Sequence, residues 1–372
     1  MAKLGEVATY INGYAFKPQD WSDKGVPIIR IQDLTGNSYQ ANRYNGEYAS
    51  KYEVNDGDVL ISWSASLGVY IWHGEKAVLN QHIFKVVFDK ERISKDFFVH
   101  QVGLILENAA SDAHGATMKH LTKPVFDALP FYLPPYEKQC EIAEVLDKVT
   151  SLISLRKQQL AKLDELVKAR FVEMFGDPIN NPMNYPKSQL GKVCDVRDGT
   201  HDSPEYYDVG YPLVTSKNVT GGKIDLSECN LISEDDYKKI CERSKVDRGD
   251  IIMPMIGTVG KPVIVNTEPM FAIKNVALIK FTPDSLVTNI YIKTLLESDY
   301  FDRAVLDKIR GGTQKFIALG DIRKLEIILP DLKHQQCFSA FVERVEQQKQ
   351  TVQQSLEKLE LMKKALMQEY FG

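Results

Sequence analysis

One long internal repeat limits which folds this chain can adopt. Residues 4–7 (LGEV) return as residues 190–193 (LGKV), 186 positions later, and residues 115–119 (GATMK) return as residues 311–315 (GGTQK), 196 positions later. The second offset holds through Gly372. Solenoid repeats are roughly 20–50 residues long. A unit of this size is therefore predicted to be a duplicated, domain-sized module.

Each module reads as a mixed α/β head followed by one long helix. Short β-branched or aromatic runs between Gly, Asn and Asp residues are typical of strands. They occupy residues 26–34, 57–63 and 82–88 in the first head, and residues 211–219, 249–255, 262–266 and 275–281 in the second. Helical stretches follow at 94–109 and 288–309, and each head closes with a proline-ended strand, at 126–135 and 322–331. The fold class is therefore α/β (α+β) heads plus long α-helices.

After each closing proline, apolar residues recur in steps of four and three, which predicts a coiled-coil helix. The predicted seam positions are Ile142, Leu146, Val149, Leu160 and Leu163 in the first helix, and Val342, Val345, Val352, Leu356 and Leu359 in the second. Gly176 followed by Pro178 is a typical helix stop. These signals divide the chain into head 1 (1–134), a central spacer helix (135–176), head 2 (177–330, with a linker at 177–189) and a C-terminal spacer helix (331–372).

A helix with one apolar stripe needs a partner, and the other copy is the nearest one. Parallel and antiparallel pairings are both compatible with the order of the modules. We expect the antiparallel one, which relates the two heads by a pseudo-two-fold axis. A rigid spacer between two related but different heads suits a partner that has its own two-fold axis and repeat distance. Double-stranded DNA is such a partner.

Composition and charge limit the partners and the cellular compartment that can be expected for this chain. The 372 residues carry a formal net charge of −4, so basic residues that bind nucleic acid would have to be gathered into patches. No run reaches the roughly 18 apolar residues of a membrane helix, and the first residues lack a signal-peptide layout. Five cysteines without a paired spacing fit a reducing compartment and argue against a structural zinc site. A cytoplasmic protein without membrane contact is expected.

The motifs of common enzymes are missing from the sequence. It has no phosphate-binding GxxxxGK[ST] or GxGxxG loop, and no histidine pair has the helical spacing of a zinc hydrolase. Residues 133–136 (LPPY) look faintly like the DPPY motif of adenine methyltransferases, but Leu133 cannot accept a hydrogen bond from a target base. A strand terminator is the preferred interpretation. We expect a binding protein with no catalytic residue, no metal and no cofactor of its own.

Three motif pairs, in the same order in both modules, resemble the specificity subunit of type I restriction–modification systems. They are LPPYEKQ (133–139) with LPDLKHQ (329–335), GDVLIS (57–62) with GDIIMPMIGTVG (249–260), and GATMKHLT (115–122) with GGTQKFIAL (311–319). The resemblance covers nearly the whole chain. Met118 and Pro254 depart from residues that are usual in the family.

The resemblance implies a non-catalytic subunit with two target-recognition domains. Each head would read one half of a split DNA site, and the paired helices would set the gap between the halves. Two methyltransferase (modification) subunits would carry S-adenosylmethionine and the chemistry, and ATP-dependent restriction subunits could join them. The alternative is a stand-alone DNA-binding or architectural protein without a methyltransferase partner. An enzyme in its own right and a purely structural coiled-coil protein are further alternatives.

Side chains suited to base edges and phosphates mark the candidate DNA contacts in the heads. They are Arg30, Gln32, Arg43, Trp63, Lys119, His120 and Lys123 in head 1, and Lys217, Asn218, Lys261, Arg310, Gln314 and Lys315 in head 2. For Trp63 a place in the domain core is the stronger interpretation. For Lys119 and Lys315 a solvated loop is an equal alternative.

Overall fold

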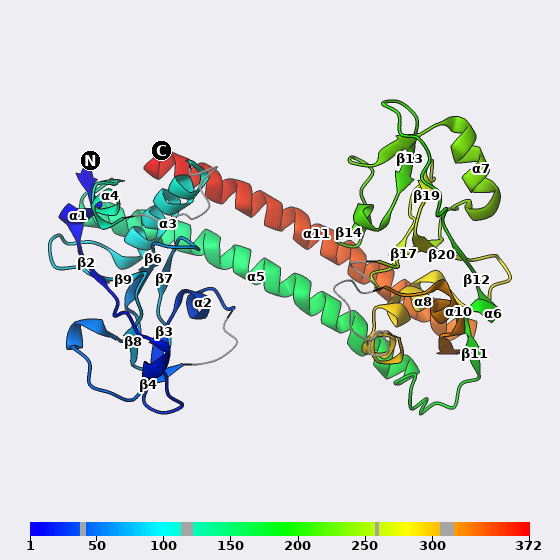
Figure 1. Cartoon of the computed structure of the whole chain (residues 1–372), viewed down its shortest axis with the longest axis horizontal. Helices are drawn as coiled ribbons and strands as arrows, with labels where there is room; N and C mark the ends of the chain where they lie inside the picture. The colour runs from blue at the N-terminus through cyan, green and yellow to red at the C-terminus, as the bar shows by residue number, and fades with distance from the viewer. Residues whose placement is uncertain (38–41, 113–121, 257–259, 306–315) are drawn as a thin grey trace. The chain divides into compact units, whose positions relative to one another are not determined.

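The computed structural model describes residues 1–37, 42–112, 122–256, 260–305 and 316–372. The chain folds as two units (Figure 1). Unit 1 consists of residues 1–157 and 354–372, and unit 2 consists of residues 158–353. Each unit therefore contains one head and a part of both long helices.

Two small sheets form the centre of head 1. The first is antiparallel throughout, and the second contains one parallel pair, β3 with β8. In spatial order the first sheet is β2 (Thr9–Asn12), β9 (Ile83–Val87), β6 (Val59–Ser62) and β7 (Gly68–Ile71), and the second is β4 (Arg43–Tyr44), β3 (Val26–Ile29), β8 (Ala77–Leu79) and β5 (Glu53–Val54).

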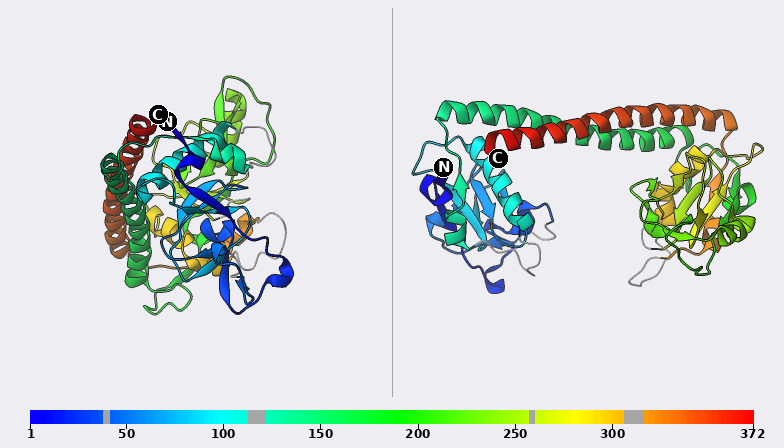
Figure 2. Two further views of the ribbon diagram at one scale, coloured as in Figure 1. Left: turned by 90° about the vertical axis from the view of Figure 1, so that its left-hand side faces the viewer. Right: turned by 90° about the horizontal axis from the view of Figure 1, so that it is seen from above.

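Strand β6 is buried on both faces, which explains its nearly unbroken apolar sequence. Val59 and Ile61 face the core under helix α3 (Lys95–Asp112), whereas Leu60 faces a smaller core shared with the second sheet. Figures 1 and 2 show α3 along the β7 side of the first sheet. Alternate side chains of one strand thus join two layers, as the two-residue period of a strand allows.

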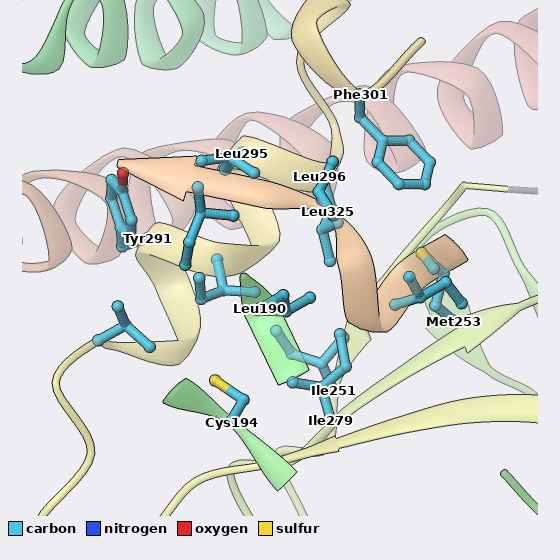
Figure 3. Packing of buried hydrophobic residues seen from close by; sticks show 14 of the residues in the cluster. Leu190, Cys194, Ile251, Met253, Ile279, Tyr291, Leu295, Leu296, Phe301 and Leu325 are labelled. Carbon is cyan, nitrogen blue, oxygen red and sulfur yellow. The ribbon is translucent and has the colours of Figure 1, made fainter. Parts of the chain in front are cut away.

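Head 2 repeats this architecture. Its antiparallel sheet has the order β12 (Asp195–Asp198), β20 (Val276–Lys280), β17 (Ile251–Pro254) and β18 (Val263–Ile264), and its second sheet has the order β16 (Asn230–Ile232), β13 (Tyr211–Val214) and β19 (Ala272–Ile273). Strands β13 and β19 are the parallel pair. Figure 3 shows the main core of unit 2, where Ile251, Met253 and Ile279 of the sheet meet Leu295 and Phe301.

Short elements complete both heads. They are β1 (Ala2–Lys3), α1 (Leu4–Val7), η1 (Pro18–Asp20), α2 (Ile31–Leu34), η2 (Ser50–Tyr52), α4 (Lys123–Asp127) and β10 (Pro130–Phe131) in head 1, and β11 (Lys187–Gln189), α6 (Leu190–Val193), η3 (Ser216–Asn218), β14 (Val219–Thr220), β15 (Lys223–Ile224), α7 (Glu234–Ser244), α10 (Leu319–Lys324) and β21 (Glu326–Ile328) in head 2. The pair β1–β10 corresponds to the pair β11–β21.

Five predicted elements are corrected by the structure. The strands expected over 126–135, 211–219 and 322–331 are shorter than predicted, because residues 126–127, 216–218 and 322–324 belong to α4, η3 and α10. The helix expected over 288–309 is interrupted, with α8 (Asn289–Leu296) and α9 (Asp299–Ala304) separated at Ser298, which takes the extended backbone of an N-cap. The strand expected over 26–34 ends at Ile29. The Asp33 carboxylate accepts from the Arg30 amide at 2.8 Å, a local bond that starts the helical turn of α2.

The two long helices are α5 (Tyr136–Phe175) and α11 (Leu332–Phe371), each of 40 residues. In unit 1, Ile142 and Leu146 near the start of α5 share a core with Leu366 and Tyr370 near the end of α11. Figure 2 shows these two segments side by side. A higher number on α5 goes with a lower number on α11, because Lys157 pairs with Glu360 at 2.9 Å. The pairing in unit 1 is therefore antiparallel.

Unit 2 has the same direction of pairing. Lys349 Nζ lies 2.7 Å from Asp164 Oδ1, and farther along α5 the Phe171 ring lies 5.6 Å from the ring of Phe338. The predicted seam positions are buried or half-buried in both units: Ile142, Leu146, Val149, Val345, Val352 and Leu356 are buried, and Leu160, Leu163, Val342 and Leu359 are half-buried. Among the described residues, no helix combines the length and apolar character needed to span a lipid bilayer.

Candidate nucleic-acid interface

Three loops of head 1 are tied together where strands β2, β3 and β8 end. The Tyr14 amide donates to Leu79 at 2.8 Å, and the Gln81 amide donates back to Tyr14 at 2.8 Å. The Asn80 amide donates to Ile29 at 3.1 Å, which attaches the loop that carries Arg30. The β6–β7 loop joins them, since the Trp63 amide donates to His82 at 3.2 Å. We call these residues (12–14, 30–34, 63–67 and 80–82) edge 1.

Head 2 builds the same arrangement from corresponding strands. The Thr200 amide donates to Ile273 at 3.0 Å, the Asn275 amide donates to Thr200 at 3.3 Å, and the Lys274 amide donates to Val214 at 2.9 Å. We call residues 198–203, 215–218 and 274–275 edge 2. Because the backbone bonds repeat while the side chains differ, the two edges present different chemistry on one scaffold.

A glycine makes the close backbone approach possible at each edge. A Cβ atom built at Gly13 would meet the Asn80 carbonyl, and one at Gly199 would meet the Ile273 carbonyl, both at less than 3.0 Å. The obstacle is backbone in both cases, so no side-chain movement can relieve it. Only glycine therefore fits these positions.

Edge 1 is built around an indole. The Trp63 Nε1–H donates to Asn12 Oδ1 at 3.2 Å, and the Trp63 ring lies 4.9 Å from the ring of His82 and 5.6 Å from that of Phe84. The residue is half-buried and packs against the main core of head 1. Trp63 therefore takes part in both the core and edge 1.

Edge 2 is built around a buried carboxylate. Asp198 has 10% of its side chain exposed, and it accepts hydrogen bonds from Arg243 and from His201 Nε2, the latter at 2.8 Å. The other ring nitrogen of His201 lies 2.8 Å from Asn275 Oδ1. The hydrogen bond to Asn275, followed by that to Asp198, raises the pKa of His201 above its usual value.

Four predicted contact residues lie at the two edges. At edge 1, the Gln32 amide, turned so that its oxygen faces Arg30, accepts from Arg30 Nη2 at 2.7 Å. At edge 2, Lys217 is exposed, whereas Asn218 Oδ1 accepts from the Thr215 amide and hydroxyl, both at 2.9 Å. Asn218 is 9% exposed, and its side chain stabilises the loop itself. With Trp63, the edges thus hold five of the predicted residues.

The other predicted residues are placed elsewhere or not described. Arg43 lies near the opposite end of β3 from Arg30, where it donates to the Gly25 carbonyl at 2.6 Å and pairs with Glu75. Lys123 pairs with Asp127 within α4 at 2.7 Å, and Lys261 is exposed. Lys119, His120, Arg310, Gln314 and Lys315 fall outside the described residues.

Several edge residues were missed in the sequence, although the repeat contained a signal for them. Asn12-Gly13 and Asp198-Gly199 stand at the same 186-residue offset as the LGEV and LGKV motifs. His82, His201 and Asn275 are recognised only when the loops are brought together. Within the described part of the chain, no three His, Cys, Asp or Glu side chains gather as metal ligands would.

Comparisons with known proteins match this architecture. A family model described as "Type I restriction modification DNA specificity domain" matches residues 1–165 and 182–361. The type I restriction enzyme EcoBI specificity subunit of Escherichia coli is 24% identical over 378 residues, which cover 92% of this chain and 78% of that protein. The MjaVIII specificity subunit of Methanocaldococcus jannaschii is 24% identical over 334 residues, covering 84% and 78%.

The fold has a counterpart among solved structures. The crystal structure of the type I restriction–modification S subunit from M. genitalium superimposes with a TM-score of 0.58 over 100% of this chain and 95% of that one, at 13% identity. At this identity the likeness establishes the fold alone. The family model, by contrast, matches both modules and most of the residues. The chain therefore belongs to the family of type I restriction–modification DNA specificity subunits.

Proposed function

We propose that edge 1 and edge 2 are the DNA-contacting surfaces of this specificity subunit, each reading one half of a bipartite target. One observation carries the proposal: the same backbone scaffold is built twice and carries different side chains. Edge 1 presents Asn12, Trp63 and Gln32, whereas edge 2 presents His201, Asn275 and Lys217. Two related surfaces with different hydrogen-bonding groups suit two different half-sites.

A lysine substitution tests edge 2. Replacing Lys217 with alanine is expected to lower the affinity for the target duplex roughly fivefold. It should also reduce the slope of log affinity against log salt by about 0.9, the value for one lost phosphate contact. Fluorescence anisotropy of the full chain with a labelled duplex, over a range of salt concentrations, measures both. The target itself comes from mapping methylated adenines in the source genome.

A matched control is available in the same head. Lys192 is also exposed, but it lies on α6, before β12, whereas edge 2 follows the other end of that strand. Lys192→Ala should leave affinity and salt slope unchanged. Equal losses from both variants would mean that edge 2 is not the interface.

We also propose the assembly in which the subunit acts. The proteins of this family work with methylase and restriction subunits and DNA, and two modification subunits that carry S-adenosylmethionine would match the two modules of this chain. ATP-dependent restriction subunits would join the same assembly. Co-purification from the source organism, followed by native mass spectrometry, should return a complex with two methyltransferase copies per chain. A chain recovered alone with its DNA would favour the stand-alone alternative.

The paired helices α5 and α11 are proposed to fix the gap between the two half-sites. Adding seven residues to each helix, beside the Lys157–Glu360 pair, preserves the heptad seam in both. The addition lengthens each helix by about 10 Å, so the unread gap should grow by roughly three base pairs. Methylation mapping in cells that carry the lengthened subunit measures the gap. An unchanged gap would show that the helices do not set it.

A further inference from the structure

The His201 ring lies between two side-chain oxygens. Nε2 faces a carboxylate oxygen of Asp198 and Nδ1 faces the amide oxygen of Asn275, each at 2.8 Å. Two oxygens can both accept only from a doubly protonated ring, because a neutral imidazole donates from one nitrogen alone. The charged groups that act on the ring are Asp198, which favours the cation, and Arg243, which opposes it. Nearby, Lys274 donates to Ser203 Oγ at 2.6 Å.

Loss of the proton would reorganise one of these two bonds. Asp198 is the stronger acceptor because it is ionised, so the neutral ring keeps its proton on Nε2. Nδ1 then becomes an acceptor and faces an acceptor oxygen. A half-turn of the Asn275 amide removes this conflict by directing its NH₂ group at the ring. On the side away from His201, the same half-turn replaces the NH₂ donors of Asn275 with its amide oxygen, which is an acceptor.

That other side is available to a ligand. Asn275 is half-buried, and none of the described residues accepts a hydrogen bond from its Nδ2. Its backbone stands at φ +55°, held by the amide bond to Thr200 at 3.3 Å. The side chain therefore starts from a fixed backbone position in edge 2. Its oxygen faces His201, and its NH₂ donors point away from the ring.

We propose that Asn275 reads one base of the half-site of head 2, and that the proton on His201 sets whether Asn275 offers donors or an acceptor. This inference rests on the proposed role of edge 2 in DNA reading. Donors match thymine O4 or guanine O6 and N7, whereas an acceptor matches the amino group of cytosine or adenine. Asn275 is thus a specificity-determining residue, and His201 is the residue that positions it.

The sign of the pH dependence follows from the raised pKa of His201. The cationic ring, with Asn275 as a donor, predominates at low pH and is lost as the pH rises through that pKa. Selection from randomised duplexes by the full chain, at about pH 6 and about pH 9, should return one position of the head 2 half-site with its preference reversed by roughly tenfold. The half-site of head 1 is the internal reference, because edge 1 carries Asn12 at the position that corresponds to Asp198.

Two variants separate the switch from general effects of pH. Asn275→Asp tolerates the same left-handed backbone and offers only acceptors, so it should show the high-pH preference at both pH values. His73→Gln alters an exposed histidine in head 1 and should behave like the unmodified chain. Histidine ring ¹⁵N shifts of the unmodified protein provide a measurement that needs no variant, and at low pH they should show both ring nitrogens of His201 protonated.

The outcomes are distinguishable. An identical base at both pH values, or a reversal that persists in Asn275→Asp, would overturn the switch and leave the role of edge 2 intact. A singly protonated His201 at about pH 6 would overturn it as well. Recovery of no head 2 half-site at either pH would instead contradict the proposed function of edge 2.

Discussion

Replacing Gly199 with alanine is expected to abolish recognition of the head 2 half-site while the head 1 half-site is still read. The new Cβ would meet the carbonyl of Ile273 and the amide of Lys274, both backbone groups, at less than 3.0 Å. Separating these segments breaks the Thr200 amide bond to Ile273, which holds edge 2 together. We expect a loss of roughly a hundredfold in affinity for a duplex with both half-sites, within the range that separates specific from non-specific binding.

The measurement compares three duplexes, one with both half-sites and two with one half-site scrambled. The Gly199→Ala variant should no longer distinguish the intact duplex from the one with a scrambled head 2 half-site. Gly13→Ala should show the mirror-image defect, because its Cβ would meet the Asn80 carbonyl in edge 1.

Gly320→Ala is the matched control in the same head. A Cβ at that position has nothing within 4 Å, and Gly320 lies in helix α10. This variant should bind all three duplexes like the unmodified chain. If Gly199→Ala weakened both half-sites equally, the edges would not be independent readers.

The repeat and the heptads of this chain could be predicted because they depend on residues close in sequence. Helix α5 begins at Tyr136, directly after the prolines at 134 and 135, and ends at Phe175, directly before Gly176. The antiparallel direction of the helix pair does not follow from neighbouring residues and required a separate argument about how the two helices pack. The contacts within each unit agree with it. Local rules thus identified the long elements and the α/β class of the heads.

Which polar residues share an edge could be predicted less well, because an edge forms from loops that are distant in sequence. Arg30 and Arg43 look equally suited to DNA, yet they lie near opposite ends of strand β3. Asn218 has the right side chain for a base edge, but its oxygen already accepts two bonds from Thr215. Which polar group remains available is a property of the folded loop, and the residue type does not reveal it.

The interrupted helix of head 2 shows the same limit at a smaller scale. The apolar spacing of residues 288–309 fits a single helix, and α3 occupies the corresponding place in head 1 without interruption. The Ser298 hydroxyl donates to the Leu295 carbonyl at 2.6 Å, at the end of α8. Ser followed by Asp is a helix-start signal that competes with continuation of the preceding helix. Here a new helix begins after Ser298, although the apolar spacing fits one continuous helix.

Replacing Gln335 with leucine is expected to lower the free energy of unfolding of unit 2 by about 3–5 kcal/mol. The side chain is fully buried, and it donates to the carbonyls of Pro330 and Leu286 at 2.8 and 3.1 Å. Its oxygen accepts from the Thr288 amide at 2.8 Å. Leucine would leave these three backbone groups without that partner, and each unsatisfied buried group costs roughly 1–3 kcal/mol.

The size of this effect follows from what Gln335 connects. It fixes the first turn of α11 to the proline-ended strand and to the start of α8, where the Thr288 hydroxyl caps the helix. Gln139 repeats the arrangement in unit 1, with bonds to the Pro134 carbonyl at 2.8 Å and the Ser94 amide at 2.9 Å. The repeated glutamine of the LPPYEKQ and LPDLKHQ motifs is therefore a joint between head and helix.

Urea unfolding followed by hydrogen exchange of the α8 amides measures the change and its location. The neighbouring Gln336 is exposed, so Gln336→Leu should alter the free energy of unfolding by less than about 0.5 kcal/mol. Gln139→Leu should reproduce the loss in unit 1, with exchange increased in α3. Single domains are stable by only about 5–15 kcal/mol. In Gln335→Leu and in Gln139→Leu, the altered head should therefore unfold locally at the start of the long helix before the rest of the chain unfolds. Equal stability of Gln335→Leu and Gln336→Leu would mean that water replaces the joint at no cost.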